Sequence, residues 1–307
     1  MRAQALKDTG MDMDFIAPTS WADALAAKAE RPDAAPICGG TDIMVELNFD
    51  LRRPPALLDL GRISELRDWS REGDRPGAAV RIGAAVPYAR IIRELSGPAP
   101  ALAQASRTVG SPQIRNRGSV GGNLGTASPA GDAHPALLAA GAVVEVESVR
   151  GRRDIPIHEF FRGVKRSALA PDELIRAVAV PAAAGPQQFA KVGSRNAMVI
   201  AVCSFAVALD PDRRRVGTGI GSAGPTPLAA PAAESFLTGA LDWARLQLPQ
   251  GAARRFGALV AAAARPIDDV RGTADYRRHA LAVLAARTLT WCLADPGRAR
   301  RGEPVPA

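Results

Sequence analysis

The stretch Gly110-Ser-Pro-Gln-Ile-Arg-Asn-Arg-Gly-Ser-Val-Gly-Gly-Asn123 decides how this sequence is interpreted. Pro112 follows a serine and favours a turn, while Arg115 and Arg117 bring positive charge. The segment Ser119–Asn123 then contains two adjacent glycines, which leave the backbone unhindered so that successive N–H groups can point at an anion. This pattern predicts one side of a phosphate-binding site.

A second glycine-rich loop lies earlier in the chain. Gly39-Gly40-Thr41-Asp42 stands between an expected strand, Pro36–Cys38, and an expected helical turn, Ile43–Leu47. At such a junction, unhindered N–H groups can bind an anion, and Thr41 can add a hydroxyl. Taken alone, the loop is more simply explained as an ordinary strand-to-helix turn. Together, the two loops predict a site that holds a diphosphate from two sides.

A carboxylate follows these loops. Ser128-Pro-Ala-Gly-Asp132 places Asp132 at the start of the helix expected over Ala133–Ala140. There it can cap the helix or accept hydrogen bonds from ribose or ribityl hydroxyls.

A third glycine motif competes with these loops. Gly219-Ile-Gly221-Ser-Ala-Gly224 matches the G-x-G-x-x-G pattern, but Pro225 and Pro227 follow it instead of a helix. A dinucleotide loop must begin a helix that faces the pyrophosphate. We therefore interpret this motif as a strand end and a turn. The sequence also contains no G-x-x-x-x-G-K-[ST] motif, which disfavours ATP hydrolysis.

Composition narrows the class of protein. The net charge is +8, but only four of the 39 basic residues are lysines and the arginines are scattered, so we expect no nucleic-acid partner. The three cysteines and three histidines are isolated, so we expect no metal site on this chain. No apolar run reaches the ~20 residues of a membrane span. A soluble cytoplasmic protein with reduced thiols is expected.

The chain is long enough for two domains. Residues 1–12 are interpreted as a disordered extension, 13–185 as a mixed helix-and-strand domain, 186–300 as a smaller α+β domain and 301–307 as a tail. The linker is placed at Ala182–Pro186 because small residues and a proline separate two patterned regions. In the second domain we expect three strands between residues 188 and 220, then helices over 232–264 and 276–293.

In these loops the sequence resembles the FAD-binding medium subunit of the xanthine, carbon monoxide and aldehyde dehydrogenase group of molybdenum hydroxylases. The resemblance also includes Asp269-Val-Arg-Gly-Thr-Ala-Asp-Tyr-Arg-Arg-His279, and its motifs run collinearly from about Asp14 to about Ala294. It implies an α+β, vanillyl-alcohol-oxidase-like (PCMH-type) FAD-binding domain in two subdomains, followed by the smaller α+β domain.

The resemblance also implies which residues bind FAD, without a covalent bond. The diphosphate would lie against the two glycine-rich loops, Val109 near the flavin, Asp132 on the hydroxyl chain, Leu169 as an apolar wall and Lys191 as a cation beside the flavin. The implied set is Ile37, Cys38, Gly39, Gly40, Thr41, Asp42, Val109, Ser119, Val120, Gly121, Gly122, Asn123, Asp132, Leu169 and Lys191. An ordinary strand-surface lysine is the alternative for Lys191.

The implied activity is that of an oxidoreductase subunit that transfers electrons. A large partner would carry molybdopterin and select the substrate, a small partner would carry 2Fe-2S clusters, and the assembly would be a dimer of heterotrimers. Two other hypotheses remain: a scaffold subunit without flavin, and a self-sufficient FAD-dependent reductase. Members that use NAD often have an acidic pair where this chain has Met198-Val199, which puts NAD as acceptor in doubt.

Overall fold

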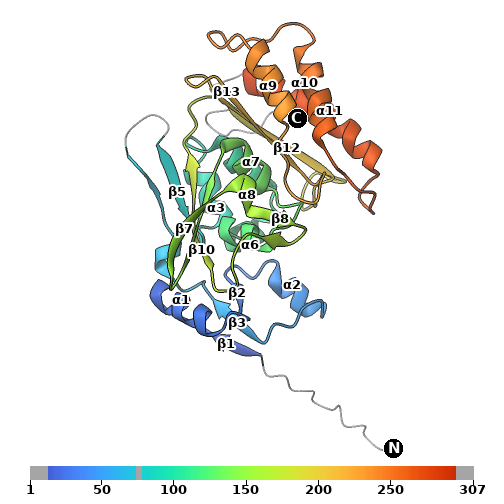
Figure 1. The fold of residues 1–307 in the computed structure, drawn as a ribbon. Helices are drawn as coiled ribbons and strands as arrows, with labels where there is room; N and C mark the ends of the chain where they lie inside the picture. Colours follow the sequence, from blue (N-terminus) through green and yellow to red (C-terminus); the bar gives the residue numbers. More distant parts are fainter. Residues whose placement is uncertain (1–12, 74–77, 295–307) are drawn as a thin grey trace, which may run out of the picture.

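The computed structural model describes residues 13–73 and 78–294 (Figure 1). The extension expected over residues 1–12, the tail expected over 301–307, and residues 295–300 of the expected second domain lie outside the described residues.

The amino-terminal part contains a small parallel sheet in the strand order β1-β3-β2. Its elements are β1 (Asp14–Ile16), α1 (Trp21–Glu30), β2 (Ala35–Ile37), α2 (Ile43–Asn48) and β3 (Ala56–Asp59). Helix α1 begins after Ser20, whose hydroxyl accepts a hydrogen bond from the Asp23 N–H. Because β2 ends at Ile37 and α2 begins at Ile43, the first glycine-rich loop lies at the carboxyl end of a parallel strand, where open sheets commonly bind ligands.

The middle part is an antiparallel sheet in the strand order β4-β5-β10-β6-β7, with short helices around it. Its strands are β4 (Trp69–Arg71), β5 (Ala79–Gly83), β6 (Val143–Ser148), β7 (Gly151–Pro156) and β10 (Leu174–Pro181). The other elements are η1 (Ser64–Leu66), α3 (Tyr88–Glu94), α4 (Pro100–Thr108), α5 (Pro112–Arg117), α6 (Val120–Thr126), α7 (Ala133–Ala140), α8 (Ile157–Phe160), β8 (Phe161–Gly163) and β9 (Arg166–Ser167).

The carboxy-terminal part is an antiparallel sheet, β11-β12-β13, with helices on both faces (Figure 1). Its elements are β11 (Gln187–Val192), β12 (Cys203–Asp210), β13 (Arg215–Gly221), α9 (Pro231–Ala240), α10 (Ala252–Ala263) and α11 (Ala274–Ala294). Side chains of β12 alternate between two hydrophobic cores. Phe205 and Val207 face the helices α9 to α11, whereas Ala206 and Ala208 belong to the core of the preceding parts. The sheet therefore joins the two cores.

Glycines on β13 let helix α7 lie directly against the strand. A Cβ on Gly217 would be 2.0 Å from the Ala139 carbonyl oxygen, and one on Gly219 would be 2.0 Å from the Pro135 carbonyl oxygen. Repeated glycines in a strand often mark such a close approach. Gly219 is the first glycine of the competing G-x-G-x-x-G motif, and a Cβ on its second glycine, Gly221, would lie 2.7 Å from Pro135 Cγ, so both serve helix-to-sheet packing.

The prediction of a helical segment over residues 232–264 is wrong in part. The segment 232–264, expected to be helical throughout, is interrupted between α9 and α10. There the Asp242 carboxylate accepts hydrogen bonds from the Ala244 and Arg245 N–H groups, and Gly251 has a φ of 79°. An aspartate that binds its own following backbone favours a turn over a helix. Among the described residues, no helix is long and apolar enough to cross a membrane.

Candidate functional site

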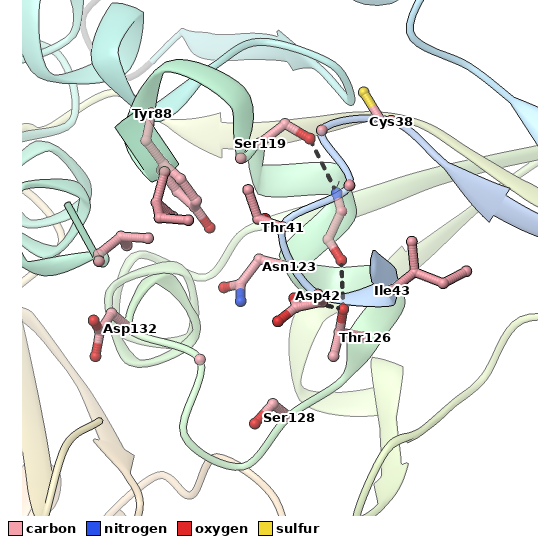
Figure 2. Close-up of a pocket in the computed structure, with 18 of the residues that line it drawn as sticks. Cys38, Thr41, Asp42, Ile43, Tyr88, Ser119, Asn123, Thr126, Ser128 and Asp132 are labelled. Atoms are coloured by element: carbon pink, nitrogen blue, oxygen red, sulfur yellow. Dashed lines mark hydrogen bonds between the residues drawn. The ribbon is translucent and has the colours of Figure 1, made fainter. Parts of the chain in front are cut away.

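Both glycine-rich stretches line one cavity of about 420 Å³ (Figure 2), a volume in the usual range for small-molecule sites. We call residues 38–42 the first wall and residues 118–132 the second wall. The two walls meet directly, because a Cβ on Gly39 would lie 2.1 Å from the carbonyl oxygen of Arg117, just before the second wall, and 3.1 Å from the Gly118 nitrogen. They are also joined by the Thr126 hydroxyl, which donates a hydrogen bond of 2.9 Å to the Asp42 carboxylate.

The first wall presents unpaired backbone donors. Gly40 has a φ of 75°, a conformation that glycine adopts readily. The N–H groups of residues 39–42 donate no hydrogen bond to any residue in the described ranges. Successive N–H groups around a left-handed residue form a concave site for an anion. The first wall can therefore bind a phosphate through its backbone.

The second wall differs from the bare loop that the sequence predicted. It begins α6, and the Ser119 hydroxyl caps this helix by accepting a hydrogen bond of 3.2 Å from the Gly122 N–H. The Gly121 N–H donates to the Ala84 carbonyl oxygen at 3.1 Å, and Val120 is fully buried. Gly122 is open and lines the cavity, since among the described residues an added Cβ would meet only the Ser119 hydroxyl, at 3.3 Å.

Asp132 and Lys191 form a buried ion pair at the end of the second wall. The Lys191 ammonium lies 2.7 Å from Asp132 Oδ2 and donates to the Thr108 carbonyl oxygen at 3.1 Å; the exposed fractions of the two side chains are 6% for Lys191 and 9% for Asp132. Burial raises the pKa of the Asp132 carboxyl, and Lys191 opposes that shift. Asp132 makes no capping hydrogen bond to α7, so capping does not explain its position.

Lys191 does not line this cavity, and its ammonium group contacts Asp132 and a backbone carbonyl. Its implied place beside the flavin stays a prediction. Arg115 and Arg117 do not line the cavity either, and Arg115 donates to the carbonyl oxygens of Val109 and Gly110. Within the described ranges, no lysine or arginine lines this cavity. An anionic ligand would therefore depend on uncharged donors.

Three buried polar atoms of the lining residues have no partner within the described part of the chain: Tyr88 Oη, Asn123 Oδ1 and Asp132 Oδ1. A buried polar atom without a hydrogen bond costs about 1–3 kcal/mol, so such atoms indicate a missing ligand or water. A hydroxyl donor and two oxygen acceptors beside a backbone anion site match a ligand with both phosphates and hydroxyls, as FAD has.

A second cavity of about 310 Å³ adjoins the first. Ile37, Cys38, Asp42 and Gly122 line both cavities, so a long ligand can extend from one into the other. Leu169 lines the second cavity, as an apolar wall should, and Gly121 borders it as well.

The structure thus brings most of the implied FAD-binding residues together. The first cavity is lined by Ile37, Cys38, Gly39, Gly40, Thr41, Asp42, Val109, Ser119, Gly122, Asn123 and Asp132. Val120 is buried away from this space, and Lys191 lies behind Asp132. Sequence reasoning missed Tyr88, one of only two tyrosines in the chain, because its position at the start of α3 carries no motif.

His134 supports the second wall from behind. Its ring is fully buried, its Nε2 lies 3.2 Å from the Asn123 carbonyl oxygen, and it packs against Phe161 with ring centroids 4.6 Å apart. Burial lowers the pKa of His134 to about 4, so the imidazole is neutral near pH 7. In the described residues, His134 joins no cluster that could hold a metal ion.

Comparison with known proteins agrees with this geometry. The family described as "FAD binding domain in molybdopterin dehydrogenase" matches residues 11–183, and "CO dehydrogenase flavoprotein C-terminal domain" matches residues 188–292. The nicotinate dehydrogenase FAD-subunit of Eubacterium barkeri is 34% identical over 242 residues, 75% of this chain and 80% of that protein. The carbon monoxide dehydrogenase medium chain of Hydrogenophaga pseudoflava is 30% identical over 285 residues, 90% of this chain and 95% of that protein.

A solved structure extends the likeness to the fold. In the carbon monoxide dehydrogenase of Hydrogenophaga pseudoflava that lacks the Mo-pyranopterin moiety, one chain matches with a TM-score of 0.83 and 27% identity, over 93% of this chain and 98% of that one. The protein therefore belongs to the family of FAD-binding subunits of molybdopterin dehydrogenases. Its fold is the FAD-binding α+β domain followed by the family's C-terminal domain.

Proposed function

We propose that this chain transfers electrons through FAD, from an iron–sulfur partner to a separate acceptor, within a molybdenum hydroxylase complex. The observation that carries the proposal is the first wall. The N–H groups of residues 39–42 have no partner in the described part of the chain, and these residues line a cavity in which three buried side-chain atoms also lack one. Unpaired donors and acceptors gathered in one cavity support the binding of a polar ligand of matching shape.

In this proposal the residues of the chain position the cofactor. The N–H groups of residues 39–42 bind the diphosphate, Asn123 and Asp132 accept hydrogen bonds from the hydroxyl chain, and Leu169 contacts the adenine end in the second cavity. Residues 13–185 would supply these contacts, and the domain over 186–300 would supply the rim at residues 198–200. Bound FAD supplies the exchange between one-electron and two-electron transfer, which this chain's side chains cannot perform.

The proposed electron transfer requires partner subunits that carry the other redox groups. We infer a large molybdopterin subunit that oxidises the substrate and a small 2Fe-2S subunit that relays electrons, assembled as a dimer of heterotrimers. Two observations support partners elsewhere: the described residues contain no cluster of three potential metal ligands, and relatives carry names such as "Nicotine 6-hydroxylase medium subunit", from Paenarthrobacter nicotinovorans.

Electron transfer is tested on purified protein by anaerobic rapid mixing. The chain is loaded with FAD and mixed with the reduced iron–sulfur subunit, and bleaching of the flavin absorption is followed. We expect bleaching only with that partner present. Protein that binds no FAD would support a flavin-less scaffold, and bleaching by an organic substrate without partners would support a self-sufficient reductase; either result contradicts the proposal.

We further propose an acceptor other than NAD. Met198 and Ile200, with exposed fractions of 56% and 52%, line the cavity together with Val199. This apolar rim has no carboxylate at residues 198–200 that could bind ribose hydroxyls. We expect NADH to leave the absorption of the FAD-loaded chain unchanged, and rapid bleaching by NADH would refute this choice.

A further inference from the structure

The Tyr88 side chain occupies an unusual position in the first cavity. It is fully buried at the start of α3, and its hydroxyl has no partner among the described residues. A Cβ on Gly118 would lie 3.4 Å from Thr41 Oγ1 and 3.6 Å from Tyr88 Cδ2. The tyrosine ring therefore lies on the same side of Gly118 as the Thr41 hydroxyl. Figure 2 shows the Tyr88 hydroxyl pointing into the space beside Thr41 and Asn123.

The charges around this hydroxyl keep it protonated. Burial raises the pKa of Tyr88 well above its ordinary value, and the carboxylates of Asp132 and Asp42 raise it further. The hydroxyl is therefore a hydrogen-bond donor at every physiological pH. It donates to neither carboxylate, although both are near enough to affect its ionisation.

The absence of cationic lining makes each uncharged donor important. Between residues 13 and 294, excluding the undescribed 74–77, no lysine or arginine lines the first cavity, and two of its lining side chains are aspartates. A diphosphate entering this space meets more negative than positive charge. Within the first cavity its binding depends on the backbone N–H groups of the first wall and on hydroxyl donors near them, since the basic side chains nearby, Lys28, Arg52 and Lys165, line the second cavity.

We propose that the Tyr88 hydroxyl donates a hydrogen bond to the diphosphate of bound FAD, beside the donors of the first wall. This inference rests on the proposed placement of FAD and adds to it a residue that no motif indicates. Tyr88 is a binding residue that compensates for the missing cation.

The test compares Tyr88→Phe with Tyr276→Phe in the full chain. Tyr276 is the only other tyrosine, lies on α11 and is half exposed, so its variant controls for loss of a phenolic hydroxyl. The chain is freed of FAD and titrated with FAD while fluorescence is followed. We expect Tyr88→Phe to weaken FAD binding by about tenfold or more, because a donor to a charged group is lost. Tyr276→Phe should bind like the wild type.

Two further measurements separate binding from folding and locate the contact. Thermal unfolding of the FAD-free protein should be unchanged or slightly higher for Tyr88→Phe, because the lost hydroxyl had no partner. At saturating FAD, ³¹P resonance spectra should differ from wild type in a diphosphate signal while the visible flavin spectrum stays the same. A shifted flavin spectrum with unchanged ³¹P signals would refute the diphosphate contact.

The outcomes are distinct from those for the proposed function. If wild-type protein binds FAD and Tyr88→Phe binds it equally well, this inference fails and the electron-transfer proposal stands. If wild-type protein binds no FAD, the proposed function fails first. If Tyr88→Phe lowers the unfolding temperature of the FAD-free chain, its hydroxyl has a structural partner and the inference is contradicted.

Discussion

The first and second walls of the cavity are both rich in glycine, but they use their backbones differently. In the first wall, the N–H groups of residues 39–42 have no partner among the described residues, and these residues line the cavity. In the second wall, Ser119 and Ala84 already accept hydrogen bonds from Gly122 and Gly121. One wall offers donors to a ligand, and the other shapes and supports the space. Glycine therefore has two roles within one site.

The largest expected effect tests how the second wall is attached to β11. Lys191→Met leaves the Asp132 carboxylate buried without its cation, which should lower the free energy of unfolding by about 3–5 kcal/mol. Chemical denaturation measures it. Lys165→Met removes an exposed ion pair with Glu46 and should cost less than about 1 kcal/mol.

The double variant completes this test. Adding Asp132→Asn to Lys191→Met removes the unpaired charge and should restore most of the lost stability. If the double variant is as unstable as Lys191→Met, the ion pair is not what attaches the wall, and the packing of the Lys191 stem is responsible.

The next largest effect on stability is expected for Gly39→Ala, which tests the contact between the two walls. A Cβ on Gly39 would collide with the Arg117 carbonyl oxygen, so Gly39→Ala should destabilise the FAD-free chain by about 2–3 kcal/mol. Gly125→Ala is the control, because nothing lies within 4 Å of its Cβ position. Equal thermal unfolding temperatures for both variants would mean that the walls separate easily.

The third prediction concerns how the unfolding free energy depends on pH, and it tests the packing of His134 behind the second wall. Burial lowers the pKa of His134 to about 4 in the folded protein, whereas an unfolded histidine titrates near 6.5. Between these values the unfolded chain binds a proton that the folded chain excludes. His134 therefore lowers stability as pH falls through this window, by at most about 1.4 kcal/mol per pH unit. Above pH 7 it has no such effect.

Denaturation at a series of pH values measures this slope. His134→Gln should flatten the dependence between about pH 6.5 and 4, whereas His158→Gln, at an exposed histidine, should leave it as in the wild type. An unchanged slope in His134→Gln would mean that the folded protein admits the proton, and that the support is looser than its burial indicates.

Gly122→Val should have the smallest effect on stability of these substitutions, but it should abolish FAD binding. Gly122→Val places a side chain in the cavity without meeting backbone, and valine is tolerated in a helix better than glycine. Unfolding free energy should change by less than about 1 kcal/mol, while FAD is lost. Gly239→Val on α9 meets nothing within 4 Å and should keep FAD. Stoichiometric FAD in purified Gly122→Val would show that the second wall is not near the cofactor.

Much of this architecture was predictable from local patterns. The strand pair β6 and β7, the three carboxy-terminal strands and helix α1 follow from short-range periodicity, turn residues and the Ser20 cap. The break between α9 and α10 was not predicted, because alanine-rich sequence favours a helix until Asp242 and Gly251 are weighed individually. Helix α6 was missed because adjacent glycines disfavour a helix, and only the Ser119 cap and the contact with Ala84 stabilise one there.

The sequence by itself determined the fold class, the family and the loop segments that line the cavity, because glycines, prolines and caps act on their near neighbours. Only the tertiary structure decided which glycine contacts a wall and which opens to the cavity, that Lys191 pairs with Asp132, and that the Tyr88 hydroxyl has no partner among the described residues. Most of these properties depend on residues far apart in the chain; Lys191 and Asp132, for example, are 59 positions apart. Their partners become known only when the chain has folded.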